Sequence, residues 1–392
     1  MNQTVKSHSR MDLVQPPIVP IVSDLIRQVP GTISLGQGVV HYGPPPEAVE
    51  AARVALGRPG THEYHDVAGL PRLRALIAAK LASENKIETN GPTEIMVTAG
   101  ANMAFMHAVL ATTSPGDEIV LPIPFYFNHE MAVEMAGCRV VRVPTDERYQ
   151  LQPHAIAKAL TNRTRAVVTI SPNNPSGAVF SEERLRAVNA LCREKALYHI
   201  TDEPYEYFTY GTARHVSPGS FPDAAGHTIS IYSLSKAFGF AGWRIGYMAY
   251  PRHLSSALMK SQDTILICPP IISQEAAVAA LEVGRHYCEP YVRELAEVRA
   301  IVLEKLAELA PLAEVPAADG AFYCLLRVRT DADQLALAER LIREHRVAVI
   351  PGSAFGIVDQ CTFRVAYGAL QKATVAEGIG RLVTGLKAIL EG

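Results

Sequence analysis

The sequence predicts an α/β protein in which a mostly parallel β-sheet is covered by helices on both faces and a smaller α+β domain is attached. Between about residue 45 and residue 285, short β-branched runs alternate with helical patterns, as in proteins with parallel sheets. A long amphipathic pattern follows, with apolar residues at three- and four-residue steps from Val292 to Leu309, and Pro311 ends it. Strand-like runs then flank a helical pattern over 331–344, which indicates the α+β part.

Apolar runs of strand length lie along the larger part, and turn-forming or polar residues follow most of them. The predicted strands are 94–98, 117–122, 166–170, 196–200 and 228–232, with 320–326 and 347–350 in the smaller part. Open α/β sheets bind ligands beyond the carboxyl ends of their strands. The residues that follow these runs are therefore the first candidates for a functional site.

Length and composition predict a large core and more than one domain, because 48% of the 392 residues are hydrophobic. We expect a large domain over 46–285 and a small domain made of 1–45 with 286–392.

A net charge of −2 gives no reason to expect nucleic acid or an anionic membrane as partner. The first ten residues are polar and carry no apolar signal segment, and no apolar run is long enough to span a membrane.

The six cysteines are scattered and form no C-x-x-C pair, which favours free thiols in a reducing, cytoplasmic compartment. The thirteen histidines show no metal-ligand spacing, so no metal site is expected.

Lys236 is the most informative residue of the chain. It lies among small and apolar residues, where desolvation lowers the pKa of an amine, and a neutral amine condenses with an aldehyde to give a Schiff base. The nearby hydroxyls of Ser233 and Ser235 and the guanidinium of Arg244 suit a phosphate dianion. An aldehyde and a phosphate on one small molecule indicate pyridoxal 5′-phosphate (PLP).

The stretch 233–244 resembles the S-x-S-K-x-x-G-x-x-G-x-R motif of the class I/II aminotransferases, PLP enzymes of fold type I and the aspartate aminotransferase superfamily. The resemblance covers roughly residues 30 to 390 and implies a seven-stranded sheet in the large domain. Ser171–Gly177 is similar to the N-P-x-G signature of that family. This similarity implies that Asn174 donates a hydrogen bond to the phenolate oxygen of PLP and lies beside the substrate.

Asp202 follows a predicted buried strand, where an unpaired acid would cost several kcal/mol. A solvated loop acid is the simple alternative. The resemblance implies that Asp202 pairs with the pyridine nitrogen and keeps it protonated, so that the ring withdraws electrons from the substrate Cα. The D-x-x-Y spacing implies that Tyr205 is a second donor to the phenolate oxygen, while Glu203 points elsewhere and receives no role.

The turn from strand 94–98 into a helix offers a second phosphate contact. Gly100 lets the backbone approach closely, and Ala101 and Asn102 supply amides at the positive end of a helix dipole. Such a turn is common in α/β proteins and gains meaning only together with the lysine motif.

Tyr126, rather than Phe125, matches the aromatic residue that stacks on the pyridine ring in the family, and core packing is the alternative for both rings. His129 matches a histidine that hydrogen-bonds the pyridine-binding aspartate in some relatives, although a lone histidine is more often structural.

Substrate contacts are expected from the two ends of the chain. Arg364, in Phe363–Gly368, matches the arginine that binds the substrate α-carboxylate with two parallel hydrogen bonds. Gly38 belongs to a segment similar to the one that covers the active site of the family. His41 and Tyr42 follow it as candidate specificity residues, with a solvated loop as the equal alternative.

Tyr64 matches a tyrosine that reaches the PLP phosphate of a neighbouring subunit, which implies a symmetric homodimer with shared active sites.

The resemblance implies a transaminase that moves an amino group from an L-amino acid to a 2-oxo acid by a ping-pong mechanism, with Lys236 as Schiff-base residue and general base. Elimination, cyclopropane formation and PLP-dependent oxidation use the same motifs and remain open.

A non-catalytic regulator is disfavoured, because the sequence shows no basic DNA-binding region. No second arginine for a distal carboxylate is evident, so strict dicarboxylate specificity is not favoured, and aromatic, aliphatic and basic donors stay possible.

Overall fold

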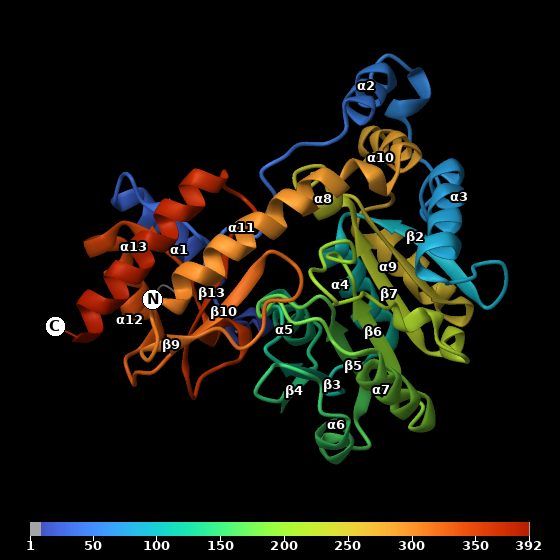
Figure 1. Ribbon diagram of the computed structural model, residues 1–392. Coiled ribbons are helices and arrows are strands. Elements are labelled where there is room, and N and C mark those ends of the chain that lie inside the picture. The colour runs from blue at the N-terminus through green and yellow to red at the C-terminus, as the bar shows by residue number, and fades with distance from the viewer. Residues whose placement is uncertain (1–8, 392) are drawn as a thin grey trace, which may run out of the picture.

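The computed structural model describes residues 9–391 (Figure 1). The polar stretch 1–8, in which we expect no signal segment and with which the predicted small domain begins, lies outside the described residues.

The centre of the larger part is a seven-stranded sheet with the order β2-β8-β7-β6-β5-β3-β4. Its strands are β2 (Thr93–Thr98), β3 (Glu118–Ile123), β4 (Arg139–Pro144), β5 (Thr164–Ile170), β6 (Tyr198–Asp202), β7 (Thr228–Ser233) and β8 (Gly246–Pro251). Neighbours pair in parallel except around β8, which is antiparallel to both β2 and β7. The predicted mostly parallel α/β sheet is confirmed.

Helices cover both faces of this sheet, as the alternation of strands and helices predicted. The helices of the larger part are α2 (Pro46–Ala55), α3 (Pro71–Lys80), α4 (Ala101–Thr112), α5 (Phe127–Met135), α6 (Pro153–Ala159), α7 (Glu182–Glu194), α8 (Leu234–Ala237), α9 (Ser255–Ile265) and α10 (Ile271–Val283). In β3, Ile119 and Leu121 pack with α4, α5 and α9, whereas Val120 between them packs with α6 and α7. Because successive residues of a strand point to opposite faces, both faces of the central strands are buried.

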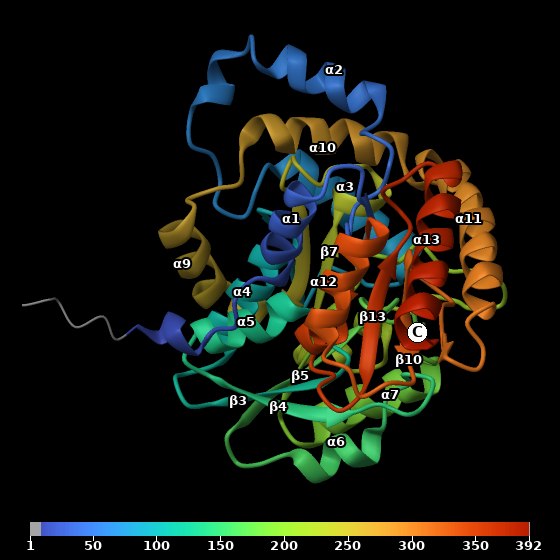
Figure 2. The same cartoon turned by 90° about the vertical axis from the view of Figure 1, so that its left-hand side faces the viewer.

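A second, antiparallel sheet of order β12-β13-β10-β9 lies in the C-terminal part. Its strands are β9 (Ala313–Glu314), β10 (Tyr323–Val328), β12 (Ile350–Pro351) and β13 (Cys361–Ala366), and it is accompanied by α11 (Glu289–Ala307), α12 (Gln334–His345) and α13 (Lys372–Glu391). In Figures 1 and 2, α11 runs from the region of α8 and α10 toward this sheet, and α12 and α13 lie beside it.

The N-terminal segment joins this second part. β1 (Ile33–Ser34) pairs in parallel with β11 (Val347–Ala348), and α1 (Ile18–Gln28) packs on α12 and on residues around Phe355. The single strand predicted over 347–350 is wrong, because its residues divide between β11 and β12 in two different sheets. The strand predicted from Ala196 begins at Tyr198, since Ala196 has a left-handed φ of 52° that no strand accommodates.

Short helical turns connect these elements. They are the 3₁₀ turns η1 (Arg10–Leu13), η2 (Pro59–His62), η4 (Pro218–Ser220), η5 (Ala224–Gly226), η6 (Arg252–Leu254), η7 (Arg285–Tyr287) and η8 (Gly352–Phe355), and the π-helical turn η3 (Leu81–Asn85).

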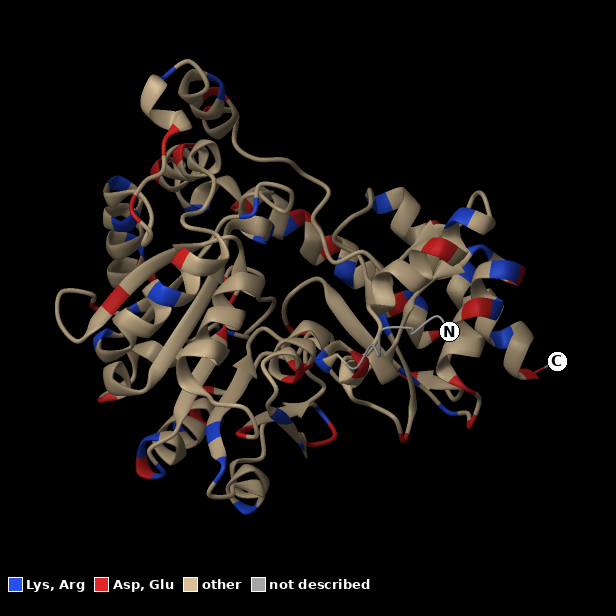
Figure 3. Cartoon of the chain, turned by 180° about the vertical axis from the view of Figure 1, so that it is seen from behind, with Lys and Arg blue, Asp and Glu red and all other residues tan. Residues whose placement is uncertain are grey.

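Charged residues of both signs are interspersed over the outer helices (Figure 3). Within residues 9–391, none of the helices has the length and apolar character needed to cross a membrane.

Candidate active site

A cavity of about 280 Å³ opens at the carboxyl ends of the parallel strands, between the larger sheet and the second sheet. It brings together most of the residues that the sequence singled out. Those that line it are Gly38, Ala101, Asn102, Tyr126, Asn174, Asp202, Tyr205, Ser233, Ser235, Lys236, Arg244 and Arg364. Residues separated by more than 300 positions along the chain thus converge on one site.

Lys236 extends from α8, a single helical turn that follows β7 directly. Residues 234–237 form this helix, which is capped by Ser233, whose hydroxyl accepts from the Ser235 N–H. The Lys236 Nζ donates to the carbonyl of Gly38 at 2.6 Å. Burial lowers the pKa of Lys236 to about 8, with the cations of Arg364 and Arg244 adding to this effect and Asp202 opposing it.

One end of the cavity is built to hold an anion. The N-terminal amides of α4, from Ala101 and Asn102, face the hydroxyls of Ser233 and Ser235 across the lining, together with Arg244. Gly100 is next to this end and has a φ of 81°; a Cβ atom there would overlap the Arg244 guanidinium. Glycine therefore serves both the left-handed backbone and the close approach of the arginine.

Asp202 ends β6 and is only 5% exposed. Its Oδ2 lies 3.1 Å from the Nε2 of His129, a ring that stacks on Phe105 with centroids 4.0 Å apart. Among residues 9–391, its Oδ1 has no hydrogen-bond partner although it is buried. A buried carboxylate oxygen that lacks a donor is costly, and the N–H of a pyridinium ring would supply one. The residues present therefore fit the cofactor that the lysine motif predicted.

Glu203 is turned away from the cavity, as expected. It accepts hydrogen bonds from the hydroxyls of Thr201 at 2.6 Å and Ser217 at 2.5 Å, and it is 1% exposed.

Hydroxyl and amide groups lie opposite the lysine. The hydroxyls of Tyr205 and Tyr323 share a hydrogen bond of 2.9 Å. Asn174 accepts through Oδ1 from Arg364 Nη1 at 2.9 Å, so its amide nitrogen remains available to donate. Burial raises the pKa of Tyr126, whose hydroxyl accepts from the amide of Asn128 at 2.8 Å.

Arg364 is buried in β13, 2% exposed, with its guanidinium over the rings of Tyr323 and Phe355. Nη2 donates to the Gly36 carbonyl at 2.7 Å, while Nε has no partner among the described residues. A buried cation with an unused donor is suited to binding a carboxylate.

Five predicted residues do not line the cavity: Gly100 and His129, which lie next to lining residues as described above, and Tyr64, His41 and Tyr42. Tyr64 is 79% exposed and lies beside the segment Leu266–Ile271. His41 faces Glu294, with 3.4 Å between Nε2 and Oε2, and Tyr42 is buried beneath α8. This placement gives no support to His41 and Tyr42 as direct substrate contacts.

Sequence reasoning missed seven residues that line the cavity, which are Val19, Val39, Phe127, Ile170, Pro204, Ala241 and Tyr323. Tyr323 lay within a predicted strand, and a tyrosine among apolar strand residues resembles ordinary core packing. Val19 carries no local signal at all, because only the packing of α1 brings it to the cavity.

Comparisons with known proteins agree with this geometry. The sequence model of the family "Aminotransferase class I and II" matches residues 30–382. The chain is 34% identical to the aromatic aminotransferase ISS1 of Arabidopsis thaliana over 383 residues, which cover 95% of this chain and 94% of that protein. It is 35% identical to a probable aspartate/prephenate aminotransferase of Aquifex aeolicus, covering 91% of both.

Solved structures show the same fold. The aspartate aminotransferase of Thermus thermophilus with maleate superposes with a TM-score of 0.90 at 32% identity, covering 97% of this chain and 100% of that one. The aromatic aminotransferase of Pyrococcus horikoshii gives 0.87 at 35% identity, covering 94% and 99%. With the lysine, the buried aspartate and the buried arginine around one cavity, the chain belongs to the class I and II aminotransferases and is a PLP-dependent transaminase acting on amino acids and 2-oxo acids.

Proposed function

We propose that Lys236 holds the cofactor and moves the proton at the substrate Cα, and that Asp202 holds the protonated pyridine nitrogen. The observation that carries this assignment is a pair of buried groups in one cavity: an amine whose pKa is lowered to about 8, and an aspartate oxygen that has no hydrogen-bond donor among residues 9–391. PLP, when bound, supplies the electron sink that makes the Cα proton removable.

The remaining lining residues divide between the two ends of the cavity. The amides of Ala101 and Asn102, next to Gly100, with Ser233, Ser235 and Arg244, hold the phosphate. Tyr126 stacks on the ring, and Asn174 and Tyr205 donate to the phenolate oxygen. Arg364 binds the substrate α-carboxylate, next to Asn174 and the backbone at Gly38.

Reductive labelling tests the assignment of Lys236. Borohydride treatment of the enzyme with PLP, followed by peptide mapping, is expected to place the pyridoxyl label on Lys236. Lys236→Ala should still retain PLP through its phosphate and ring contacts but lose transamination. A label on any other lysine would overturn the assignment.

We further propose that the amino donor has an apolar side chain, aromatic or aliphatic. Val19, Val39 and Phe127 belong to the apolar part of the lining, and Val19 and Phe127 continue into the hydrophobic cluster around Phe355. The cations of the lining are Lys236, Arg244 and Arg364, and each is already assigned to another group. Two relatives named above are aromatic aminotransferases, which is in line with this proposal.

A donor panel tests this preference. We expect kcat/KM for phenylalanine and leucine to exceed that for aspartate. Val19→Lys should shift the ratio of kcat/KM values toward aspartate by about fivefold, since one partly exposed ion pair contributes on the order of 1 kcal/mol. Val19→Met, of similar reach and without charge, is the control. A wild-type preference for aspartate would refute the proposed donor class and leave the transaminase assignment intact.

We propose a homodimer in which Tyr64 serves the phosphate of the neighbouring subunit. Its high exposure supports this role, as do the exposed apolar side chains of Val49, Val54 and Leu56 in and after α2. Tyr64→Phe should weaken PLP retention without changing the melting temperature of the cofactor-free protein. Sedimentation showing a fully active monomer would refute the dimer.

The expected division into a large domain (46–285) and a small domain (1–45 with 286–392) stays a proposal, supported by the pairing of β1 with β11 and by the two separate sheets. A cytoplasmic location is likewise proposed, and the six free cysteines support a reducing compartment. Limited proteolysis tests the domain division, which predicts cleavage near residues 45 and 285. Thiol titration of freshly isolated protein tests the reducing location, which predicts that the cysteines are free.

A further inference from the structure

The carbonyl of Lys236 has an unusual hydrogen-bond donor. A one-turn helix such as α8 leaves its last carbonyls without helical partners. The backbone supplies a long bond of 3.3 Å to the Lys236 carbonyl, from the N–H of Gly239, and the N–H of Phe238 is shared between this carbonyl and that of Leu234. The hydroxyl of Tyr42 donates to the same carbonyl at 3.0 Å and lies 3.4 Å from that of Ala237. The main chain of Lys236 is therefore held by a side chain nearly 200 residues away in sequence.

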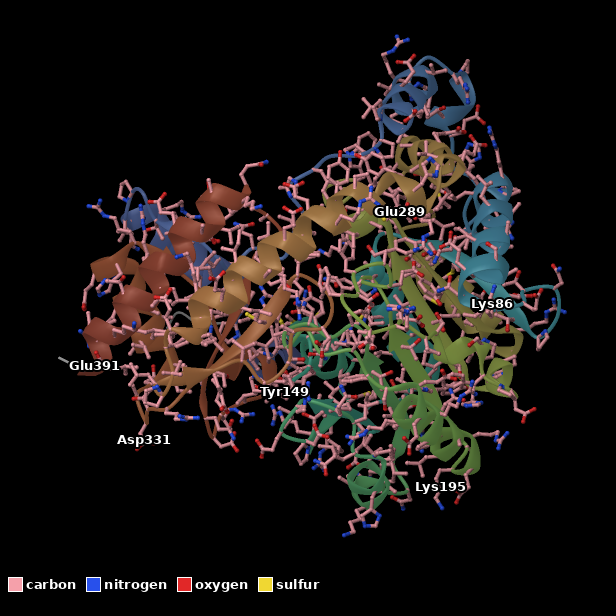
Figure 4. All side chains as sticks on the ribbon, in the orientation of Figure 1. Lys86, Tyr149, Lys195, Glu289, Asp331 and Glu391 are labelled. Carbon is pink, nitrogen blue, oxygen red and sulfur yellow. The ribbon has the colours of Figure 1, made fainter. Side chains whose placement is uncertain are left out.

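The ring of Tyr42 is itself held firmly. It stacks on Tyr291 of α11, with centroids 3.9 Å apart and an interplanar angle of 11°, and it is 8% exposed. Figure 4 labels Glu289, the first residue of α11, two positions before this tyrosine. Burial raises the pKa of Tyr42 far above its usual value, so the hydroxyl keeps its proton and remains a donor.

The segment that carries Tyr42 also contacts the amine. The carbonyl of Gly38 accepts from Lys236 Nζ, and Gly43 packs so closely on the turn after α8 that a Cβ on Gly239 would overlap its carbonyl. Tyr287, next to Tyr42, donates to the Gly43 carbonyl at 2.7 Å. Gly38–Gly43 therefore fixes both the backbone and the side chain of Lys236.

We propose that Tyr42 is a positioning residue for Lys236: its hydroxyl fixes α8 so that the amine stays aligned for proton transfer at the substrate Cα. This inference rests on the proposed role of Lys236. Proton transfer depends steeply on alignment, since a base must lie within hydrogen-bond reach of the proton that it removes. A looser α8 would reduce the fraction of time that the amine spends in that geometry.

Tyr42→Phe removes the hydroxyl and keeps the stacked ring. Tyr287→Phe is the matched control, because it removes a hydroxyl-to-carbonyl bond of the same aromatic cluster that ends on Gly43 and not on α8, and it keeps the ring that stacks on Phe238. In the cofactor-free protein, hydrogen exchange of the amides of Phe238 and Phe240, which both donate to Leu234, reports on α8 directly. In the enzyme with PLP, kcat and KM for the amino donor are measured separately.

For Tyr42→Phe we expect exchange of these amides to be about threefold to tenfold faster, and kcat to fall by a similar factor with KM unchanged, as the loss of one hydrogen bond implies. Tyr287→Phe should leave both readouts at the wild-type level. Wild-type exchange and kcat in Tyr42→Phe, or equal losses in the two variants, would overturn the proposal. Full activity of Lys236→Ala would instead overturn the proposed function itself, so the two failures are distinguishable.

Discussion

The lowered pKa of Lys236 predicts how its amine responds to pH in the cofactor-free enzyme. With a pKa of about 8, about one-tenth of the amine is neutral at pH 7 and about nine-tenths at pH 9. The reactivity of Lys236 should therefore rise about tenfold over this interval and then level off. An ordinary lysine with a pKa near 10.4 would instead rise about a hundredfold without a plateau.

Competitive acetylation measures this directly. Trace acetic anhydride is added to the cofactor-free protein at each pH with a lysine-containing peptide as internal standard, and modification of Lys236 is quantified by mass spectrometry. Arg364→Gln tests whether the neighbouring cation contributes to the lowered pKa of Lys236, because removing that cation should move the titration of Lys236 to higher pH. A hundredfold rise without a plateau up to pH 9, or an unchanged titration in Arg364→Gln, would refute the reasoning.

The same pKa has a consequence for stability. Between the folded value near 8 and the unfolded value near 10.5, the unfolded chain binds more protons at this site than the folded chain. The contribution of Lys236 to the free energy of unfolding should therefore increase as pH rises through this window. Denaturant unfolding of the cofactor-free protein at pH 8 and pH 10, compared with Lys236→Ala, measures it; an equal change in both proteins would argue against the shifted pKa.

Four substitutions test the rest of the site. Arg364→Lys should lower kcat/KM about tenfold to a hundredfold, because an ammonium cannot form two parallel bonds to a carboxylate; unchanged steady-state kinetics would assign the carboxylate to another group. Asp202→Ala should slow turnover on the order of 10²- to 10³-fold. Glu203→Gln should instead lower the melting temperature and leave the turnover per folded enzyme near normal, because Glu203 only holds the hydroxyls of Thr201 and Ser217. The reverse pattern would mean that Glu203 is the functional acid. Gly100→Ala should destabilise the fold by about 1–3 kcal/mol and speed the loss of PLP on dialysis, because the new Cβ displaces Arg244; wild-type melting and retention would contradict the close approach.

The sequence by itself determined the fold class and the cofactor chemistry. Strand-length apolar runs separated by helical patterns predict a parallel sheet, because the two periodicities reflect which side chains each element buries. The residues around Lys236 and Asp202 could be found from local context, since a lysine in apolar surroundings and an acid at a strand end each require a partner. Both observations depend on neighbours that are close in the chain.

Tertiary structure decided what depends on distant neighbours. Val19 and Tyr323 reach the cavity only because α1 and β10 pack where they do, and nothing in their local sequence distinguishes them from core residues. The run 347–350 looked like one strand, yet its two halves pair with partners in two different sheets. Tyr42 looked like a loop residue, whereas its hydroxyl holds the backbone of Lys236, because hydrogen bonds between segments 194 residues apart form only when the whole chain packs.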